Sequence, residues 1–349
     1  MAQSCDRIVD GLRQAGVSID IIHFTSDTTK PRHQKQQNGS YTSIPFVNSE
    51  AHVLNLAWNT IKKLPPTDLL VCFGGYLSMT GAPIYSQWLS VPLATMIRGN
   101  DLDNGIFTPR KRDILRDALL QSKTICTVSS DKAWKIEQWT KHGNVHYVAN
   151  GIDMQKWQPA VSEVTFATAW KQKYANDKLV LGLFGQLKAK KGVDFFLHSL
   201  RKTSHTKDTH LLLVGELDEQ IETLLEETGC TYTLMPFHDR YELLKYYLCC
   251  DAIVIPSYYD GMPNVLLEAG ALAIPVLASQ VDGMADVITS GENGLLFSAG
   301  DDDSCRQAIY KLFDNTAEQR KALGQRLQST IANQYTLNHE INAYQKLLF

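Results

Sequence analysis

Apolar and polar residues are distributed along the chain in two different patterns. Short apolar runs such as 68–74 (DLLVCFG) and 178–185 (KLVLGLFG) are typical of strands buried on both faces. Segments such as 51–64 and 108–122 carry apolar residues at the three- to four-residue spacing of amphipathic helices. Strands that alternate with helices indicate parallel sheets covered by helices, so the predicted fold class is α/β, with doubly wound, Rossmann-like domains. Further strands are predicted at 17–24, 92–99, 124–130, 210–215, 251–257 and 274–279.

Two domains are predicted from the length and from a second series of strands. A chain of 349 residues is long for a single core, and the second series begins at Lys178. We predict an N-terminal domain over 1–158, a C-terminal domain over 159–334, and a final helix at about 335–349 that packs back on the first domain. The polar segment 25–40 contains turn residues and no apolar period, which predicts a loop.

The chain opens on a predicted helix at 5–16 (CDRIVDGLRQAG). A doubly wound domain normally begins with a strand and a Gly-rich turn before that helix. Its first strand usually lies in the middle of the sheet, so without it neighbouring backbone would be unpaired. We therefore expect a longer form of the protein to supply a strand and a Gly-rich turn before Ala2.

Composition excludes several classes of function. The formal net charge is −3, so no global basic field attracts nucleic acid. No apolar stretch is long enough to span a bilayer, and the first residues lack the pattern of a signal peptide. The seven cysteines are scattered without a C-x-x-C pair, which predicts small buried hydrophobic residues in a reducing cytoplasm. A cytoplasmic location follows, and peripheral association with the inner face of the membrane is left open.

A tight turn at the end of a predicted strand carries a possible anion site. The segment 257–276 (SYYDGMPNVLLEAGALAIPV) follows a buried strand, and Gly261 and Pro263 predict a turn before a helix that begins at about Asn264. The N-terminal amides and the positive dipole end of that helix would face a ligand beyond the strand.

Two carboxylates accompany this helix start. Asp260 lies in the turn, and Glu268 lies in the helix with its side chain leaning back toward the same place. Carboxylates accept hydrogen bonds from sugar or ribose hydroxyls, so the pair suggests a ligand that combines phosphate with sugars. On this stretch alone, a purely structural explanation is equally good, with Asp260 as a common turn residue and Glu268 as a partner of the helix dipole.

A second loop of the same kind follows the strand at 178–185. Gly185 allows close approach of a backbone, and Lys191 and Gly192 precede another predicted helix. Lys191 could neutralise a diphosphate, whereas Lys188 and Lys190 are predicted to be solvated charges. Two such loops at strand ends of one sheet lie where open α/β sheets bind ligands.

At this point the chain resembles a known family. The run G-x-L-x-x-x-K-G at 185–192, the apolar strand 211–215, the stretch 256–279 and the segment 282–297 (DGMADVITSGENGLLF) are similar to the second domain of the retaining glycosyltransferases of family four. NGID at 150–153 resembles the segment that ends the family's first domain. The resemblance extends from about Thr124 nearly to the end. It implies the GT-B fold, in which the two domains face each other across a cleft.

The resemblance implies a role for each residue of the second domain. The family's two acidic residues, which are separated by seven others, correspond to Asp260, which would contact the transferred sugar, and Glu268, which would hold the ribose hydroxyls. Lys191 would meet the diphosphate. Donor contacts, many through the backbone, would come from Gly185, Gln186, Phe237, Gly261, Met262, Pro263, Asn264 and Val265, with the segment 234–239 (LMPFHD) at the nucleobase.

Some positions depart from the family pattern. Gln186 replaces a frequent Arg, which removes one cation from the diphosphate, and Ala273 replaces a Gly. In the first domain the stretch RGND places Arg98 where His is common, and Arg cannot act as a base. Arg98 and Asp101 are predicted on the acceptor side, where Arg98 could bind a phosphate or carboxylate; a simple pairing of Arg98 with Asp101 is the alternative.

No metal site and no cofactor are predicted. The D-x-D pattern at 101–103 is short enough to arise by chance, and the Asp residues of 300–313 are expected to cap a helix whose apolar face is Ile309, Leu312 and Phe313. No His or Cys spacing suggests zinc.

The expected activity is transfer of a sugar, with retention, from a nucleotide-diphosphate sugar to an acceptor hydroxyl. The acceptor would be a glycan or a lipid-linked precursor in polysaccharide biosynthesis. The alternative is a non-catalytic, glycosyltransferase-like binding subunit, which Gln186, Arg98 and the missing strand motivate. An epimerase of the same fold is disfavoured because no His or Glu cluster provides the base it needs.

Overall fold

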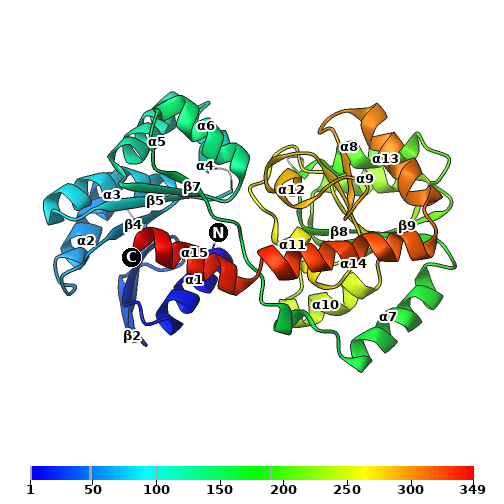
Figure 1. The fold of residues 1–349 in the computed structure, drawn as a ribbon, viewed down its shortest axis with the longest axis horizontal. Helices are drawn as coiled ribbons and strands as arrows, with labels where there is room; N and C mark the ends of the chain where they lie inside the picture. Colours follow the sequence, from blue (N-terminus) through cyan, green and yellow to red (C-terminus); the bar gives the residue numbers. More distant parts are fainter. Residues whose placement is uncertain (1, 47–48, 100, 189–190) are drawn as a thin grey trace. The chain divides into compact units, whose positions relative to one another are not determined.

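The computed structural model describes residues 2–46, 49–99, 101–188 and 191–349. The chain divides into two compact units, and each is described by itself. The first unit comprises Met1–Ala149 and Asn338–Phe349, and the second comprises Asn150–Leu337. The last helix, α15 (Leu337–Leu348), therefore belongs almost entirely to the first unit, where it is drawn in red near the blue helix α1 (Figure 1).

The second unit is built on one six-stranded parallel sheet in the order β10-β9-β8-β11-β12-β13. The strand that comes first in sequence, β8, lies between β9 and β11, so the chain winds outward in both directions as in a doubly wound fold. The strands are β8 (Leu179–Leu187), β9 (Thr209–Leu217), β10 (Thr231–Met235), β11 (Ala252–Ile255), β12 (Val276–Ser279) and β13 (Leu295–Phe297).

Helices between these strands bury the apolar sides of the sheet. Leu181 and Leu211 of neighbouring strands pack with Phe196 and Leu225 of the covering helices in one core. The described helices of the unit are the 3-10 helix η1 (Met154–Trp157), α7 (Val161–Tyr174), α8 (Val193–Arg201), α9 (Glu219–Thr228), α10 (Arg240–Leu248), α11 (Asn264–Ala271), α12 (Asp282–Val287), α13 (Asp302–Asp314) and α14 (Ala317–Gln334).

The described strands of the first unit form two sheets. One is parallel, in the order β4-β5-β6-β7, and the other has the order β1-β3-β2. Strands β1 and β4 are thus edge strands of these two sheets. In the second unit the central strand, β8, pairs with β9 on one side and with β11 on the other. A further strand before Ala2 stays a prediction. The strands are β1 (Ile19–Thr25), β2 (Arg32–Gln36), β3 (Gly39–Pro45), β4 (Leu70–Phe73), β5 (Leu93–Ile97), β6 (Thr124–Thr127) and β7 (Val145–Tyr147).

The prediction of a loop over 25–40 was wrong. Residues 32–36 form β2, which pairs antiparallel with β3 from Arg32↔Ser43 to Gln36↔Gly39. Every residue of β2 is exposed, so its side chains carry no apolar period. The strand is formed by backbone hydrogen bonds at the edge of a sheet, where polar side chains are favourable because they discourage aggregation.

Helices of the first unit pack on these sheets around two apolar clusters. One contains Leu93, Ile97, Leu115 and Ile125, and the other contains Ile44 and Val53. The helices are α1 (Ala2–Gln14), α2 (Glu50–Ile61), α3 (Tyr76–Leu89), α4 (Asp101–Gly105), α5 (Pro109–Gln121), α6 (Ser130–Thr140) and the returning α15.

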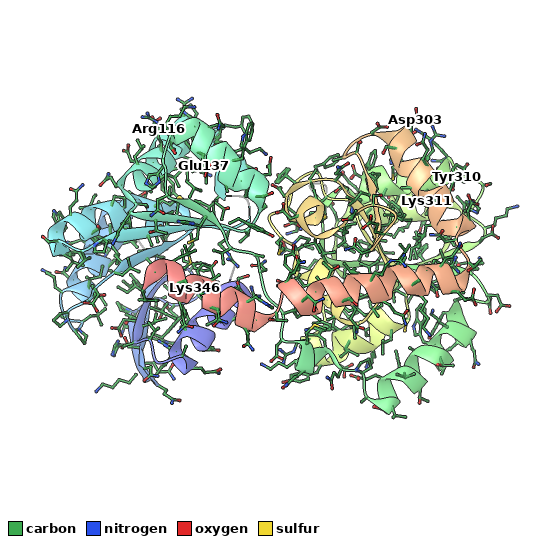
Figure 2. All side chains as sticks on the ribbon, in the orientation of Figure 1. Arg116, Glu137, Asp303, Tyr310, Lys311 and Lys346 are labelled. Atoms are coloured by element: carbon green, nitrogen blue, oxygen red, sulfur yellow. The ribbon has the colours of Figure 1, made fainter. Side chains whose placement is uncertain are left out.

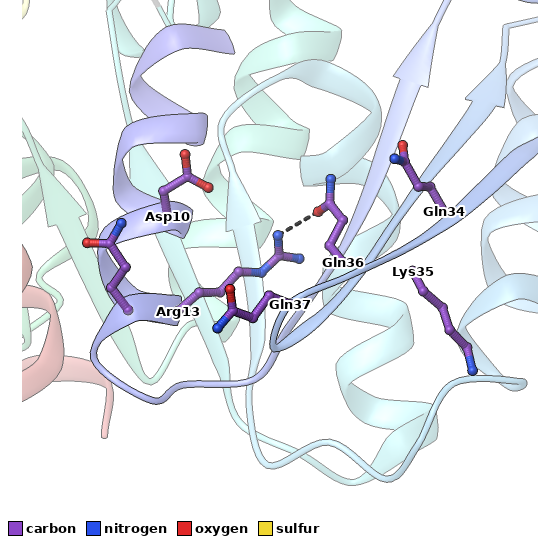
Figure 3. Close-up of a pocket in the computed structure, with 7 residues that line it drawn as sticks. Asp10, Arg13, Gln34, Lys35, Gln36 and Gln37 are labelled. Carbon is purple, nitrogen blue, oxygen red and sulfur yellow. Dashed lines mark hydrogen bonds between the residues drawn. The ribbon is translucent and has the colours of Figure 1, made fainter.

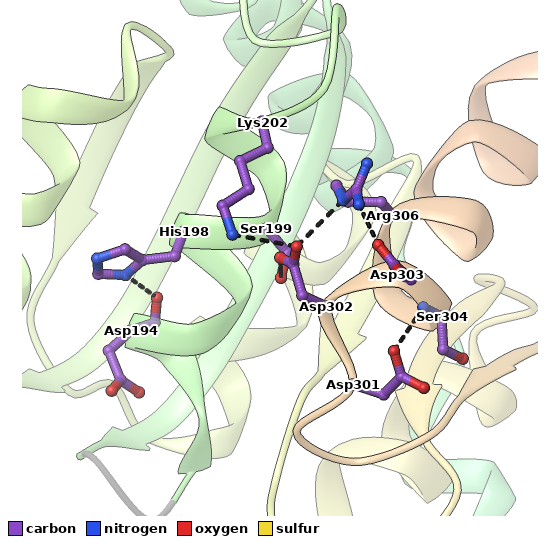
Figure 4. A network of polar contacts seen from close by, with 9 residues as sticks. All are labelled: Asp194, His198, Ser199, Lys202, Asp301, Asp302, Asp303, Ser304 and Arg306. Carbon is purple, nitrogen blue, oxygen red and sulfur yellow. Dashed lines mark hydrogen bonds and ion pairs between the residues drawn. The ribbon is translucent and has the colours of Figure 1, made fainter.

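The three consecutive aspartates at 301–303 serve the start of α13. Asp301 is the N-cap and accepts a hydrogen bond from the Ser304 amide at 3.0 Å. Asp302 accepts from Ser199 and is paired with Lys202 and Arg306 (Figure 4).

The predicted apolar face of α13 is confirmed for Ile309 and Leu312, which are buried, and Phe313 is half-buried. Asp303 and Lys311 lie on the exposed part of the helix (Figure 2). The predicted helix cap is therefore confirmed.

The cysteines are placed as small hydrophobic residues. All seven are free thiols, and all except Cys5 are buried. Burial raises the pKa of the Cys72 thiol, for example, to about 12, so the thiol stays protonated at neutral pH. Within the described residues, no helix has the length and hydropathy needed to cross a membrane.

We expect the second unit to become less stable at pH values below 6.5 because of His210. The ring is buried between Thr231 and Thr233, each 3.0 Å away, and burial followed by the charge of Lys178 lowers its pKa from 6.5 to about 4. As the pH falls, the unfolded chain takes up this proton before the folded one. The free energy of unfolding should therefore decrease by about 3 kcal/mol between pH 6.5 and 4.

Urea unfolding at a series of pH values measures the slope of the free energy of unfolding against pH. His210→Gln, which can still hydrogen-bond both threonines, should flatten it. His198→Gln, an exposed control, should leave it unchanged. Identical slopes for both variants would exclude His210 as the titrating group.

Candidate functional site

The loop that leaves β8 is held tightly against the end of β11. Gly192 caps the N-terminus of α8 in the left-handed region, with φ +63°. A Cβ added to Gly192 would lie 2.1 Å from the carbonyl oxygen of Pro256, so only glycine permits this approach. The preceding residue, Lys191, is therefore fixed beside the turn that follows β11.

An ion pair joins the two loops. The Lys191 ammonium contacts the Asp260 carboxylate, and their side chains are 30% and 15% exposed. Strands β8 and β11 are neighbours, and the chain leaves them toward opposite edges of the sheet. Open α/β sheets bind ligands at this kind of position, so the pairing brings two predicted site residues to the expected place. Ala189 and Lys190 lie outside the described residues.

Three buried or conformationally restricted residues shape the turn at Asp260. The Asp282 carboxylate accepts a hydrogen bond from the Asp260 amide at 3.0 Å, and the Gly283 amide donates to the Gly261 carbonyl at 2.7 Å. Asn150 is buried and donates from its side chain to the Met262 carbonyl at 2.7 Å. Sequence reasoning missed these roles, although all three residues lie in segments that resemble the family.

Helix α11 begins at Asn264, as predicted, with Pro263 at its N-cap. Because the N-cap is proline, no side chain caps the helix by a hydrogen bond. Amides of a first turn need acceptors from outside the helix, and an anionic ligand can provide them. Asn264 and Val265 of this turn are half-buried, so their surroundings are partly open to solvent.

Glu268 lies on the second turn of α11 and is half-buried. One of its carboxylate oxygens, Oε2, accepts a hydrogen bond of 2.6 Å from the hydroxyl of Tyr247 on α10. Sequence reasoning missed Tyr247, because 21 residues and a strand separate it from Glu268.

The remaining predicted donor residues lie at the carboxyl ends of strands. Gly185 has φ +103° and open space where a Cβ would point, and Gln186 is exposed. Phe237 follows β10, with 65% of its surface exposed, and Asp239 caps α10 by accepting from the amides of Tyr241 and Glu242. The segment after β10 thus presents backbone and an exposed ring at the same edge as the other loops.

In the first unit, Arg98 follows β5 and is buried. Its guanidinium donates to the Tyr344 hydroxyl at 2.6 Å and lies 3.6 Å from the Glu340 carboxylate, both on α15. Its backbone amide donates to Asp101, whose carboxylate also accepts from Gly75. Burial raises the pKa of Asp101 above its usual range. The pairing with α15 was not predicted, because 246 residues separate Arg98 from Tyr344; an acceptor contact stays a prediction.

The other aspartate of the D-x-D pattern, Asp103, also has a partner. Its carboxylate lies 2.6 Å from the ammonium of Lys132, whose side chain is fully buried. In the described residues, this pair and the backbone contacts of Asp101 tie α4 to its neighbours.

Glu340→Gln should lower the free energy of unfolding by about 3 kcal/mol. The Glu340 carboxylate is fully buried between Arg98 and Arg7, whose guanidinium approaches it to 2.8 Å. A neutral amide would leave two arginines without their shared negative charge. Chemical denaturation measures the loss. Glu50→Gln is the matched control, because the Glu50–Arg110 pair is largely exposed and should contribute at most about 1 kcal/mol. Equal losses in both variants would show that the buried ion pair contributes no more to the free energy of unfolding than the exposed pair does.

A polar hollow of about 420 Å³ lies elsewhere in the first unit (Figure 3). The Arg13 guanidinium beside it donates to the backbone carbonyls of Ile19 and Ser40 and to the side chain of Gln36. These contacts are at the amino ends of β1 and β3, and none of the predicted site residues lines the hollow. Arg13 therefore has a structural role in joining α1 to the sheet.

Comparison with known proteins supports a relationship in the second unit. Residues 178–315 match the family described as "Glycosyl transferases group 1". The capsular polysaccharide biosynthesis glycosyltransferase CapM of Staphylococcus aureus is 26% identical over 199 residues, which are 54% of this chain and 50% of CapM. The chain thus matches about half the length of that relative.

Solved structures extend the similarity to both units. Sucrose-phosphate synthase from Thermosynechococcus elongatus superposes with a TM-score of 0.83 at 18% identity, covering 98% of this chain and 90% of that one. Anabaena HepE in complex with UDP-glucose has a TM-score of 0.75 at 15% identity, covering 88% and 85%. The fold is α/β with two Rossmann-like domains, as predicted, and the chain is similar to the group 1 glycosyltransferases of the GT-B fold.

Proposed function

We propose that the protein transfers a sugar from a nucleotide-diphosphate sugar to an acceptor hydroxyl, with retention of the anomeric configuration and without a metal ion. The observation that carries the proposal is the pairing of Lys191 with Asp260 beside the N-terminus of α11. A cation, a helix N-terminus and a carboxylate at one strand edge suit a ligand that joins a diphosphate to a sugar.

Each part of the nucleotide sugar would then have a partner on the second unit. Lys191 and the first amides of α11 would stabilise the negative charge that grows on the diphosphate as the glycosidic bond breaks. Asp260 would accept hydrogen bonds from the transferred sugar, and Glu268 from the ribose hydroxyls. The backbone near Phe237 would contact the nucleobase. The UDP-glucose complex of the structurally similar HepE supports a nucleotide sugar as donor.

The acceptor is proposed to be a glycan or a lipid-linked precursor, which the name of CapM supports. Arg98 and Asp101 are proposed to lie on the acceptor side, where the Arg98 amide donates to the Asp101 carboxylate and Glu340 pairs with the Arg98 guanidinium. A cytoplasmic protein that acts at the inner face of the membrane would meet both substrates.

Transfer assays with UDP-, ADP- and GDP-hexoses test the proposal. The expected result is turnover of one donor that persists in EDTA, with a product whose anomeric configuration, read by NMR, equals that of the donor. Tight donor binding with neither hydrolysis nor transfer, across a broad acceptor panel, would indicate a non-catalytic binding subunit. Absence of binding for every nucleotide would contradict both functions.

A further inference from the structure

The hydroxyl of Tyr247 is a rigidly held hydrogen-bond donor. The side chain is fully buried on α10, and its ring stacks on Phe184 with a centroid distance of 4.1 Å and an interplanar angle of 7°. Trp157 contacts the same ring edge-on at 5.7 Å. Two aromatic partners at right angles prevent the ring from turning or shifting, so the hydroxyl keeps one position.

This fixed donor is directed at one residue of the candidate site. The hydroxyl donates to Oε2 of Glu268 at 2.6 Å, a short contact that is typical of a charge-assisted hydrogen bond. Burial, and then the charge of Glu268, raise the pKa of Tyr247 well above 10, so the hydroxyl keeps its proton at neutral pH. Glu268 has a flexible three-carbon side chain, and a single bond of this kind selects one orientation of its carboxylate.

The two rings that pack on Tyr247 also connect Glu268 with the loop that leaves β8. Phe184 is the residue directly before Gly185, where β8 leads into that loop, and Trp157 belongs to η1, which follows the segment 150–153. The position of the Glu268 carboxylate is therefore set by β8, the strand that leads into the loop of Lys191. A ribose and a diphosphate are joined in one ligand, so their protein partners must keep a constant separation.

We propose that Tyr247 is a positioning residue for donor recognition, which orients the Glu268 carboxylate so that it accepts hydrogen bonds from the ribose hydroxyls. The inference rests on the proposed function, because it assigns the ribose to Glu268. It goes further in naming the residue that makes this recognition selective for ribose. A carboxylate held in one orientation discriminates between ligands that differ by one hydroxyl better than a mobile one does.

Tyr247→Phe tests the proposal because it removes one hydroxyl and leaves the stacked ring. The probes are UDP, ADP and GDP, with the tightest binder compared with its 2′-deoxy form by calorimetry. We expect the dissociation constant of the ribonucleotide to rise about five- to tenfold. The preference for ribose over 2′-deoxyribose should fall by a similar factor, while kcat at saturating donor stays within about twofold.

Tyr85→Phe is the matched control. Tyr85 is also buried, and its hydroxyl donates to the carbonyl of Leu54 at 2.7 Å in the first unit. Both variants lose one buried hydrogen bond and should lose similar thermal stability, but Tyr85→Phe should keep the ribose preference. A purely structural role for Tyr247 predicts the same result for both variants.

The double variant Tyr247→Phe/Glu268→Gln completes the cycle. If Tyr247 acts through Glu268, the phenylalanine should not weaken nucleotide binding further once the carboxylate is absent. An undiminished effect, or an unchanged ribose preference in Tyr247→Phe, overturns the proposal and leaves the proposed function intact. Failure of the wild-type protein to bind any of the three nucleotides overturns the proposed function itself.

Discussion

Replacing Lys191 with alanine is expected to lower turnover by about 100-fold or more, with little change in melting temperature. Negative charge concentrates on the leaving diphosphate in the transition state, and Gln186 provides no second cation there. In the structure Lys191 is paired with Asp260 and its side chain is 30% exposed. An ion pair with this exposure contributes at most about 1 kcal/mol to stability, so the fold should tolerate its loss.

Lys188→Ala is the matched control for Lys191→Ala. Lys188 belongs to the same loop, is 50% exposed, and lies 3.7 Å from Glu216 rather than from a predicted site residue. Steady-state kinetics of the two variants, measured side by side, should show a large loss of kcat only for Lys191. Similar losses in both would mean that the loop provides a general positive field, and that Lys191 has no specific contact with the diphosphate.

Glu268→Gln is expected to weaken donor binding by about 1.5–3 kcal/mol. The amide keeps the shape of the side chain, and its oxygen can still accept the hydrogen bond from Tyr247, which donates to the carboxylate at 2.6 Å. The amide nitrogen would then take the place of the second carboxylate oxygen. A donor would face the ribose hydroxyls where an acceptor is needed, and the negative charge would be gone.

The loss for Glu268→Gln should shrink when the donor carries 2′-deoxyribose, because one of the two affected hydroxyls is already absent. Calorimetric titrations of both nucleotides against both proteins measure this difference. Glu222→Gln, an exposed carboxylate on α9, should change neither affinity. Equal losses for ribose and deoxyribose donors would reduce Glu268 to a helix residue that has no contact with the sugar of the nucleotide.

The linear order of residues was enough to predict one half of the candidate site. The strand before Ser257, the turn at Gly261 and the helix from Asn264 are consecutive, and their periods and turn residues are local properties. The α/β class followed for the same reason. The edge strand β2 was missed because all its side chains are exposed, so its hydrogen bonds leave no apolar pattern.

The resemblance named Lys191, Asp260 and Glu268 individually, but it did not predict what holds them. Lys191 and Asp260 are 69 residues apart and meet because β8 and β11 are neighbours in the sheet. Tyr247 reaches Glu268 from another helix, and its ring stacks on Phe184 of β8. Such contacts depend on strand order and on close packing, to which residues from distant segments contribute together.

What the sequence by itself determined is therefore most of the local elements, though not β2, together with the fold class and the chemical types present at the strand ends. The tertiary structure alone decided the partners: Asp260 for Lys191, Tyr247 for Glu268, and Glu340 for the buried Arg98. The physical reason is that helix and strand periods arise from interactions between near neighbours, whereas the partner of a buried charge or hydroxyl is set by which elements the folded core brings together.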